Sequence, residues 1–362
     1  ESAATNSYCF YETRRLKLFS PSFHGGMPPP QTPSHPAWAP TSPPPSPPVR
    51  QSTGGGEPSS KKARVSSEAV VFHEPKVMAE IGCNHMGNFE IAKELLTLAK
   101  QAGADYGKFQ KRNPKELLTK AQYEAPHPNP RNSYGATYGA HREFLELTVD
   151  QHRELKAHCD TIGLGYSCSV WDITSAREIA SIAPDLIKVG SPSNTHWEMQ
   201  KILRDEYAGD VHVSTGMTTK DEIEQIVSFW EEGKGDAKHR LVLYNCTSGY
   251  PVPFEDVCLL ELRDLYDRYA HRVKHLGFSG HHLGIAIDIA AYALGATWNE
   301  RHFTKDRTWK GTDHAASLEP AGLQKLCRDL KAAWKCMGRK ATDILPIEAE
   351  QRAKLKWGCY NK

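Results

Sequence analysis

Residues 277–320 read GFSGHHLGIAIDIAAYALGATWNERHFTKDRTWKGTDHAASLEP, and this stretch predicts the fold of the whole chain. An apolar run at Val273–Ser279 is closed by Gly280, and a second short run covers Ala296–Phe303. Between them, Ile285–Leu294 is rich in small residues and apolar on all sides, as in a packed helix. A strand, a helix and a second strand in this order predict a right-handed unit with parallel strands.

The strand ends of this unit carry side chains that can do chemistry. Because parallel strands end at the same edge of a sheet, we expect His281 and His302 side by side, with Glu300 and Asp313 close by. Two imidazoles with carboxylates can hold a divalent cation and leave coordination positions open for a substrate. A single histidine at a strand end more often makes an ordinary hydrogen bond, so the spacing leaves both interpretations open.

The same alternation runs from residue 76 onward, with about thirty residues in each strand–helix unit. Eight units predict a parallel sheet that closes as a (β/α)₈ barrel. The competing fold is an open doubly wound sheet, but no GxGxxG fingerprint follows any predicted strand. The predicted strands are Val77–Ile81, Tyr106–Gln110, Gly165–Val170, Leu186–Gly190, Val211–Thr215, Leu241–Cys246, Val273–Ser279 and Ala296–Phe303. The helices between them include one that follows a polar insertion at 112–141 and ends at His158, and one at Val257–Tyr269.

The chemistry of such barrels lies at the carboxyl ends of the strands. These ends carry two lysines, Lys108 and Lys188, which suit a small dianion such as a phosphate ester when hydroxyl donors accompany them. The alternative for Lys188 is a structural ion pair with Asp185 or Glu198. The other polar residues at the predicted strand ends are Glu80, Gln110, Ser169, Ser191, Ser214, Ser248, Tyr250 and Ser279.

The composition argues against several classes of function. The formal net charge is +2 and the basic residues are dispersed, so neither nucleic acid nor an acidic membrane surface is indicated as a partner. The nine cysteines include no CxxC motif, which predicts reduced thiols and a cytoplasmic protein. No apolar run reaches the ~20 residues that a membrane-spanning helix needs.

Residues 1–70 are rich in proline, serine and glycine and show no helical or strand period, so we expect them to be disordered. Two PxxP sequences, at 33–36 and 40–43, fit an SH3-type groove, although such matches arise by chance in a proline-rich tract. Basic residues at positions 14, 15 and 17 leave organelle targeting open, and the proline content argues against it.

Three further motifs accompany residues 277–320: AEIGCNHMGNFEIAKELLTLAKQAGADYGKFQKR at 79–112, STGMTTKDEI at 214–223 and CTSGYPVPFEDV at 246–257. Together they closely resemble the sialic acid synthase family, the N-acylneuraminate and N-acylneuraminate-9-phosphate synthases, over about Val77–Trp357. The resemblance implies a (β/α)₈ barrel and a transferase that condenses phosphoenolpyruvate with N-acetylmannosamine or its 6-phosphate. The products would be a nine-carbon 2-keto sugar acid and phosphate, with Mn²⁺ or Mg²⁺ as the cofactor. Mannose 6-phosphate would need the same contacts except around the acetamide.

The resemblance also implies roles for individual residues. His281 and His302 fall on the metal ligands, with His282 as a second choice for the first of them. The catalytic positions are Glu80, Glu300 and Asp313. The substrate-binding positions are Lys108, Gln110, Ser169, Lys188, Ser191, Ser214, Ser248, Tyr250 and Ser279. Lys310 is added because Arg307 and Lys310 follow the eighth strand, where barrels commonly bind phosphate, and this favours a phosphorylated acceptor.

The chain is expected to divide into the segment 1–70, a synthase barrel at 71–345 and a tail at 346–362. Many family members continue into an antifreeze-like domain that supplies an arginine, and none follows here, so we expect a barrel-only form or a truncated one. Another cation would then have to cover the sugar, with Lys111, Arg112 and Arg142 as the candidates. A homodimer formed through the barrels is compatible with the sequence.

Three other functions compete with this interpretation. One is another phosphoenolpyruvate-dependent synthase that makes a shorter keto sugar acid from a shorter aldose phosphate. A second is a Schiff-base aldolase that uses Lys188 or Lys108. The third is a non-catalytic barrel that acts as a scaffold through its proline-rich arm, although the many polar groups at the strand ends speak against it.

Overall fold

The computed structural model describes residues 70–358 of the chain, which belong to one compact unit, Val65–Lys362. The predicted disorder of 1–70 and the two PxxP sequences concern residues that, apart from residue 70, lie outside this range. No helix within 70–358 combines the length and the apolar character that a membrane span requires.

Eight strands pair in sequence order, and β8 pairs with β1, so the sheet closes into a barrel. Every pairing between neighbouring strands is parallel, which confirms the predicted (β/α)₈ fold. The strands are β1 (Lys76–Gly82), β2 (Tyr106–Lys111), β3 (Gly165–Val170), β4 (Leu186–Val189), β5 (Asp210–Ser214), β6 (Leu241–Cys246), β7 (His275–Gly280) and β8 (Trp298–His302).

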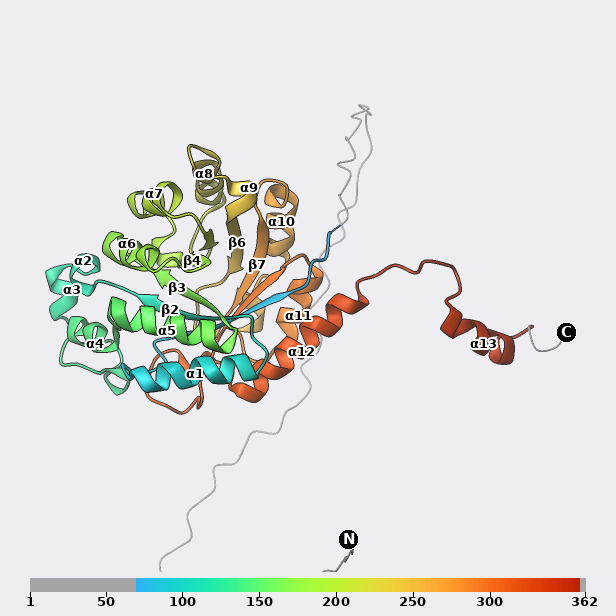
Figure 1. The fold of residues 1–362 in the computed structure, drawn as a ribbon, viewed down its shortest axis with the longest axis horizontal. Coiled ribbons are helices and arrows are strands. Elements are labelled where there is room, and N and C mark those ends of the chain that lie inside the picture. The colour runs from blue at the N-terminus through green and yellow to red at the C-terminus, as the bar shows by residue number, and fades with distance from the viewer. Residues whose placement is uncertain (1–69, 359–362) are drawn as a thin grey trace, which may run out of the picture. The chain divides into compact units, whose positions relative to one another are not determined.

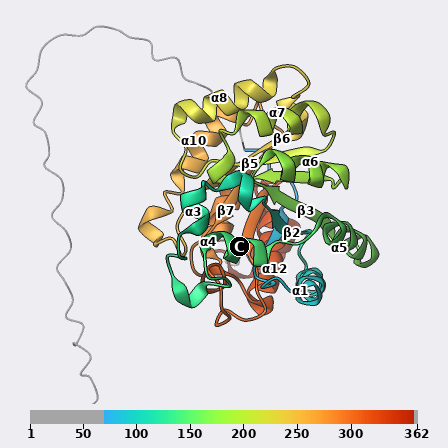
Figure 2. The ribbon, with the colours of Figure 1, turned by 90° about the vertical axis from the view of Figure 1, so that its left-hand side faces the viewer.

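The helices lie on the outside of the strands (Figures 1 and 2). Several begin at a side chain that caps the free backbone N–H groups of the first turn, as Asn88, Asp172 and Thr219 do. The main helices are α1 (Phe89–Gln101), α5 (Val149–Ile162), α6 (Ile173–Ser181), α7 (Trp197–Glu206), α8 (Lys220–Glu231), α10 (Leu260–Tyr269), α11 (Ala286–Ala293) and α12 (Pro320–Cys336). Shorter elements are α2 (Pro114–Leu117), α3 (Lys120–Glu124), η1 (Pro130–Asn132), α4 (Tyr138–Leu145), η2 (Ser191–Ser193), α9 (Ala237–Arg240), η3 (Phe254–Asp256), η4 (His314–Ala316) and α13 (Pro346–Leu355).

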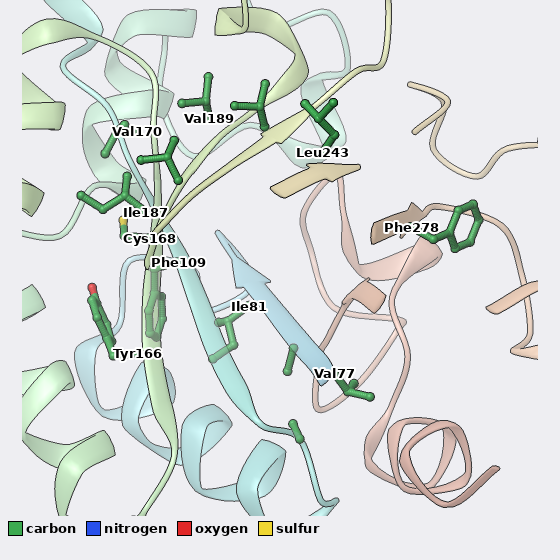
Figure 3. Packing of buried hydrophobic residues seen from close by; sticks show 14 of the residues in the cluster. Val77, Ile81, Phe109, Tyr166, Cys168, Val170, Ile187, Val189, Leu243 and Phe278 are labelled. Carbon is green, nitrogen blue, oxygen red and sulfur yellow. The ribbon is translucent and has the colours of Figure 1, made fainter. Parts of the chain in front are cut away.

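Alternate residues of β1, β4 and β6 belong to two apolar layers. Val77 and Ile81 of β1 belong to the large cluster between the strands and the helices (Figure 3). Met78, between them, belongs instead to a small cluster inside the barrel. The inner cluster consists of Met78, Leu186, Val242, Tyr244 and Trp298. A cavity lined by polar residues opens at the carboxyl ends of the strands. Most residues of the inner cluster stand two positions before one of these polar residues and point to the same face of the strand, so the inner cluster forms an apolar floor beneath the cavity.

Some predicted boundaries are wrong. The expected helix ending at His158 is two helices, α4 and α5, because Thr148 and Gln151 form a reciprocal capping box that starts a new helix. The expected helix at 257–269 begins only at Leu260, since Cys258 has a left-handed backbone with φ of +48°. Strand β7 begins two residues later than expected because the Val273 N–H still donates to the carbonyl of Tyr269. The tail contains α13, none of whose residues is buried.

Candidate active site

A cavity of about 680 Å³ opens at the carboxyl ends of the strands. Elements of the insertion after β2 contribute to its wall, and Figure 1 shows α2, α3 and α4 together on the left of the barrel. In Figure 2, which looks at the molecule from that side, α3 and α4 lie toward the viewer. The predicted site residues that line the cavity are Glu80, Lys108, Gln110, Ser169, Lys188, Ser191, Ser214, Ser248, Tyr250, Ser279, His281, Glu300, His302 and Asp313. Of the residues to which the resemblance assigns a catalytic, substrate-binding or first-choice metal-binding role, only Lys310 is not among them.

The strand register explains why these residues meet. Glu80 of β1 lies opposite Lys108 of β2 on one side and opposite His302 of β8 on the other. Ser279 of β7 lies opposite Glu300 of β8. Since residues opposite each other in a parallel barrel point to the same face, their side chains converge inside the barrel mouth.

Two buried lysines and two buried carboxylates form the centre of the cavity. The Nζ atom of Lys108 lies 2.5 Å from Oε2 of Glu80 and 3.8 Å from Oε1 of Glu300. The Nζ atom of Lys188 lies 2.7 Å from Oε2 of Glu300, so this lysine pairs with neither Asp185 nor Glu198. Buried cations are costly without a partner, and here the carboxylates provide one.

The charges of this group control one another. Burial alone would raise the pKa of Glu300, but Lys108 and Lys188 outweigh it and hold the pKa below its usual range. Burial lowers the pKa of Lys188, and the carboxylate of Glu300 opposes that shift. Burial also disfavours the charged form of Lys108, yet Glu300 and Glu80 raise its pKa overall. Glu300 therefore acts as an ionised counter-ion for both lysines.

Hydroxyl groups complete this region of the cavity. The Nζ atom of Lys108 donates to Oγ of Ser169 at 2.7 Å. Ser191 accepts a hydrogen bond from the backbone N–H of Gly216 at 3.0 Å. A Cβ atom at Gly216 would lie 2.5 Å from Oγ of Ser248 and 2.6 Å from Oγ of Ser191. Only glycine allows the two hydroxyls to approach the backbone so closely, and together they provide donors for an anionic group.

The two predicted metal ligands lie side by side. The ring centroids of His281 and His302 are 5.4 Å apart, and the ring of Tyr250 lies 4.3 Å from that of His281. Nδ1 of His281 lies 3.0 Å from the carbonyl oxygen of Thr247. Because a carbonyl only accepts, Nδ1 carries the proton and Nε2 keeps a free lone pair. A backbone carbonyl that fixes the tautomer in this way is a common support for a metal-binding histidine.

The imidazole pair suits a divalent cation. Burial and the neighbouring His302 lower the pKa of His281 to about 3, which keeps the ring in the neutral form that binds metals. The buried Nδ1 of His302 has no hydrogen-bond partner among the described residues and lies 3.9 Å from Oδ2 of Asp313. Within residues 70–358, no three His, Cys, Asp or Glu side chains form a ready metal cluster. The residues present therefore fit a cation that takes its remaining ligands from substrate and water.

A third group of side chains gathers around Gly82. Gln110 donates from Nε2 to Oε1 of Glu80 at 2.6 Å. Gly82 has a φ of +54°, and a Cβ atom there would lie 3.1 Å from Nε2 of Gln110 and 3.2 Å from Oε1 of Glu80. Oδ2 of Asp313 would lie 3.6 Å from the same atom. The missing side chain thus lets an amide and two carboxylates face one space beside the imidazole pair.

The wall formed by the insertion contains residues that sequence reasoning missed. Arg112 and Arg142, two of the predicted candidate cations, line the cavity. The third, Lys111, lies 3.5 Å from Glu178 and does not line it. The missed wall residues of the insertion are His127, Asn129, Asn132 and Tyr138, and Trp171, directly after β3, also lines the cavity. The only available signal was the richness of the insertion in Pro, Asn, Tyr and His.

The loop after β8 does not form the predicted phosphate site. The ammonium of Lys310 lies 4.6 Å from the ring centroid of Tyr134, outside the cavity lining. The guanidinium of Arg307 donates to the carbonyl oxygen of Ala315. Arg307 is thus held by its own loop, and Lys310 lies against an aromatic ring of the insertion after β2.

His282, the second choice for the metal ligand, belongs to a buried network on the other side of the strands. Arg301 donates to Oδ2 of Asp288 at 2.6 Å, and to the carbonyl oxygens of His282 at 2.6 Å and Gly284 at 2.7 Å. Arg301 and Asp288 are fully buried, and Nε2 of His282 lies 3.2 Å from the same carboxylate oxygen. The network holds the backbone that follows His281.

Known proteins share both this sequence and this fold. The model of the NeuB family matches residues 95–342. N-acetylneuraminate-9-phosphate synthase from Homo sapiens is 34% identical over 284 residues, which cover 78% of this chain and 77% of that protein. N,N'-diacetyllegionaminic acid synthase from Campylobacter jejuni is 32% identical over 262 residues, covering 72% of this chain and 77% of that protein.

A solved structure agrees with these relatives. N-acetylneuraminic acid (sialic acid) synthetase from Leptospira borgpetersenii, crystallised with citrate, superposes with a TM-score of 0.66 at 26% sequence identity. The match covers 79% of this chain and 93% of that one. The family match, the shared fold and the shared motifs agree with the resemblance that the sequence predicted, and the chain belongs to the NeuB family.

Proposed function

We propose that this chain is a transferase that condenses phosphoenolpyruvate with N-acetylmannosamine, its 6-phosphate or mannose 6-phosphate. The products are a nine-carbon 2-keto sugar acid, an N-acylneuraminate or its 9-phosphate, and inorganic phosphate. One observation carries the proposal: two buried lysines with hydroxyl donors and two neighbouring imidazoles line the same cavity. The names of the relatives, which include sialic and legionaminic acid synthases, support the same class of reaction.

Phosphoenolpyruvate binds at the lysines in this proposal. Lys108 and Lys188 face its phosphate and carboxylate, with Ser169, Ser191 and Ser248 as hydroxyl donors. The apolar floor beneath them keeps water away and strengthens each electrostatic contact. Glu300 forms ion pairs with both lysines. These pairs hold the two ammonium groups in position before the substrate binds.

The reaction needs no nucleophile from the protein. C3 of the enol attacks the aldehyde carbon of the open-chain sugar, which forms the new C–C bond, and the aldehyde oxygen takes a proton. Water adds at C2 and the bond from C2 to the phosphate oxygen breaks, leaving a ketone and inorganic phosphate. The protein orients both reactants and shields C2 until water arrives. Glu80, held by Gln110 and Lys108, is the proposed general base for that water, and Asp313 steadies the sugar.

His281 and His302 would hold the cofactor, Mn²⁺ or Mg²⁺. Bound there, the cation would supply Lewis-acid stabilisation to the negative charge that develops on the aldehyde oxygen of the acceptor. Burial keeps His281 in its neutral form. The hydrogen bond to the carbonyl of Thr247 fixes its tautomer.

Side-by-side kinetics test the proposal. Purified protein is assayed with phosphoenolpyruvate and four sugars, with and without Mn²⁺: N-acetylmannosamine, its 6-phosphate, mannose 6-phosphate and arabinose 5-phosphate. We expect phosphate release and a nine-carbon keto acid from at least one of the first three. Turnover of the pentose alone would identify a shorter-chain synthase and refute the proposal.

The Schiff-base alternative has its own test. Lys188 has a pKa lowered by burial, but its ammonium lies 2.7 Å from Oε2 of Glu300, which favours the charged and non-nucleophilic form. We therefore expect no covalent adduct after treatment with borohydride in the presence of substrate. An adduct on this lysine, with activity that resists a chelator, would overturn the proposed reaction.

A further inference from the structure

We propose that Arg142 binds the terminal phosphate of the acceptor sugar, so that this chain selects a phosphorylated aldose over the free sugar. The inference rests on the proposed function and adds the residue that decides the acceptor. It replaces the predicted phosphate site at Arg307 and Lys310, neither of which lines the cavity. Arg307 donates to its own loop backbone, and Lys310 lies against the ring of Tyr134.

The pairing of charges in the cavity distinguishes Arg142 from the other cations. The three other cations that line the cavity each have a carboxylate within 4 Å. Lys108 lies 2.5 Å from Glu80, and Lys188 lies 2.7 Å from Glu300. Arg112 lies 3.6 Å from Glu146. Among the side chains of residues 70–358, Arg142 forms no such ion pair, although it lines the cavity. An arginine on a cavity wall with no internal anion is available to an anion of the substrate.

Arg142 is also held in position by its neighbour. Its Nε and Nη2 donate to the hydroxyl oxygen of Tyr138, at 3.0 and 2.6 Å, one helical turn earlier on α4. Its Cζ atom lies 5.0 Å from the centroid of the same ring. Arginine has five N–H groups, and two are used here, so three remain for a ligand. A guanidinium fixed in this way loses less conformational entropy when it binds a phosphate.

The position of Arg142 points to the acceptor, not to phosphoenolpyruvate. Lys108 and Lys188 lie on barrel strands directly above the apolar floor, whereas Arg142 lies on the insertion that forms the outer wall. Asp313, whose Oδ2 lies 3.9 Å from Nδ1 of His302, lines the same cavity as Arg142. A sugar whose aldehyde faces the imidazoles would thus extend past Asp313 toward Arg142.

The wall around Arg142 is polar and suits the rest of a sugar. Asn129, Asn132 and His127 line the same cavity from the insertion. Amide side chains offer both donors and acceptors, which sugar hydroxyls need. The insertion therefore provides neutral contacts for hydroxyl groups and one unpaired cation for a terminal phosphate.

The test compares two acceptors in the wild type and in two variants of Arg142. Wild type, Arg142→Met and Arg142→Lys are assayed with N-acetylmannosamine 6-phosphate and with N-acetylmannosamine, and the KM for phosphoenolpyruvate is measured in each. Arg131→Met is the matched control, because Arg131 is an exposed arginine of the same insertion that does not line the cavity. Circular dichroism shows whether each variant is folded.

We expect Arg142→Met to raise the KM for the phosphorylated sugar roughly 10- to 140-fold, the loss of a charged hydrogen-bonded contact. The KM for phosphoenolpyruvate and the turnover of the free sugar should stay within about twofold, with Arg142→Lys intermediate because lysine keeps the charge without the fork. An equal effect on both sugars, an effect on phosphoenolpyruvate instead, or a wild type that turns over only the free sugar would each overturn the inference and leave the proposed function intact. If wild type condenses neither of these sugars nor mannose 6-phosphate, the proposed function fails first.

Discussion

The substitution Lys188→Met separates the two tasks that the structure gives to this lysine. Lys188 is buried, its ammonium lies 2.7 Å from Oε2 of Glu300, and 4.1 Å from the ring centroid of Tyr244. Breaking a buried ion pair costs about 3–5 kcal/mol because one charge is left without a partner. Lys108 remains 3.8 Å from Oε1 of Glu300, so we expect the lower end of that range for the free energy of unfolding.

The same substitution should weaken phosphoenolpyruvate binding. A hydrogen bond to a charged group contributes about 1.5–3 kcal/mol, which corresponds to roughly 10- to 140-fold in the Kd. Urea denaturation measures the first effect, and isothermal titration with phosphoenolpyruvate in the presence of Mn²⁺ measures the second.

The double variant Lys188→Met/Glu300→Gln distinguishes the two effects. Replacing Glu300 by glutamine removes the unpaired charge, so most of the lost stability should return. Phosphoenolpyruvate binding should stay weak because the cation is still missing. If the double variant recovers binding together with stability, Lys188 serves only the fold. An unchanged Kd in the single variant would equally refute the role of Lys188 in binding phosphoenolpyruvate.

Two further substitutions test the buried network of Arg301 and the space around Gly82. Arg301→Met leaves the buried carboxylate of Asp288 without its guanidinium and should lower the free energy of unfolding by about 3–5 kcal/mol in urea. Arg272→Met, which breaks surface pairs with Glu224 and Glu231, is the control and should cost less than about 1 kcal/mol per pair; equal losses would contradict the account of the network. Gly82→Ala forces alanine into a left-handed backbone at about 1–2 kcal/mol and brings a methyl group within 3.2 Å of Glu80. We expect kcat to fall while the protein remains folded, and an unchanged kcat would remove Glu80 from the mechanism.

The barrel and most of its mouth could be predicted from the sequence for a physical reason. Strands of a parallel barrel are short, buried runs that end at one rim, so residues such as Lys108, Lys188 and His302 can be assigned to that rim without coordinates. The distances between them could not be predicted. The sharing of Glu300 by both lysines depends on side-chain directions inside the closed barrel, which a linear pattern does not contain.

The outer wall of the site was harder to predict. Residues 112–145 contain short helices whose positions depend on contacts between distant residues, such as the hydrogen bond from Tyr134 to the carbonyl of Lys310. From the sequence, Arg142 was only one of three candidate cations for the sugar. The structure shows that the other two, Lys111 and Arg112, form ion pairs with carboxylates of the protein, and such pairing cannot be read from the sequence. The predicted phosphate site on the loop after β8 is wrong for the same reason, since Arg307 donates to the backbone of its own loop.

His281 and His302 are proposed to hold a divalent cation beside the lysine pair. Titration of the protein with Mn²⁺, followed by the electron paramagnetic resonance signal of the free ion, tests it without reference to activity. Wild type and His239→Ala, a variant of an exposed surface histidine, should bind the ion equally. His281→Ala and His302→Ala should each lose this binding while circular dichroism shows an unchanged fold. Mn²⁺ binding as tight as in wild type in either of these variants would show that the residue replaced is not a metal ligand.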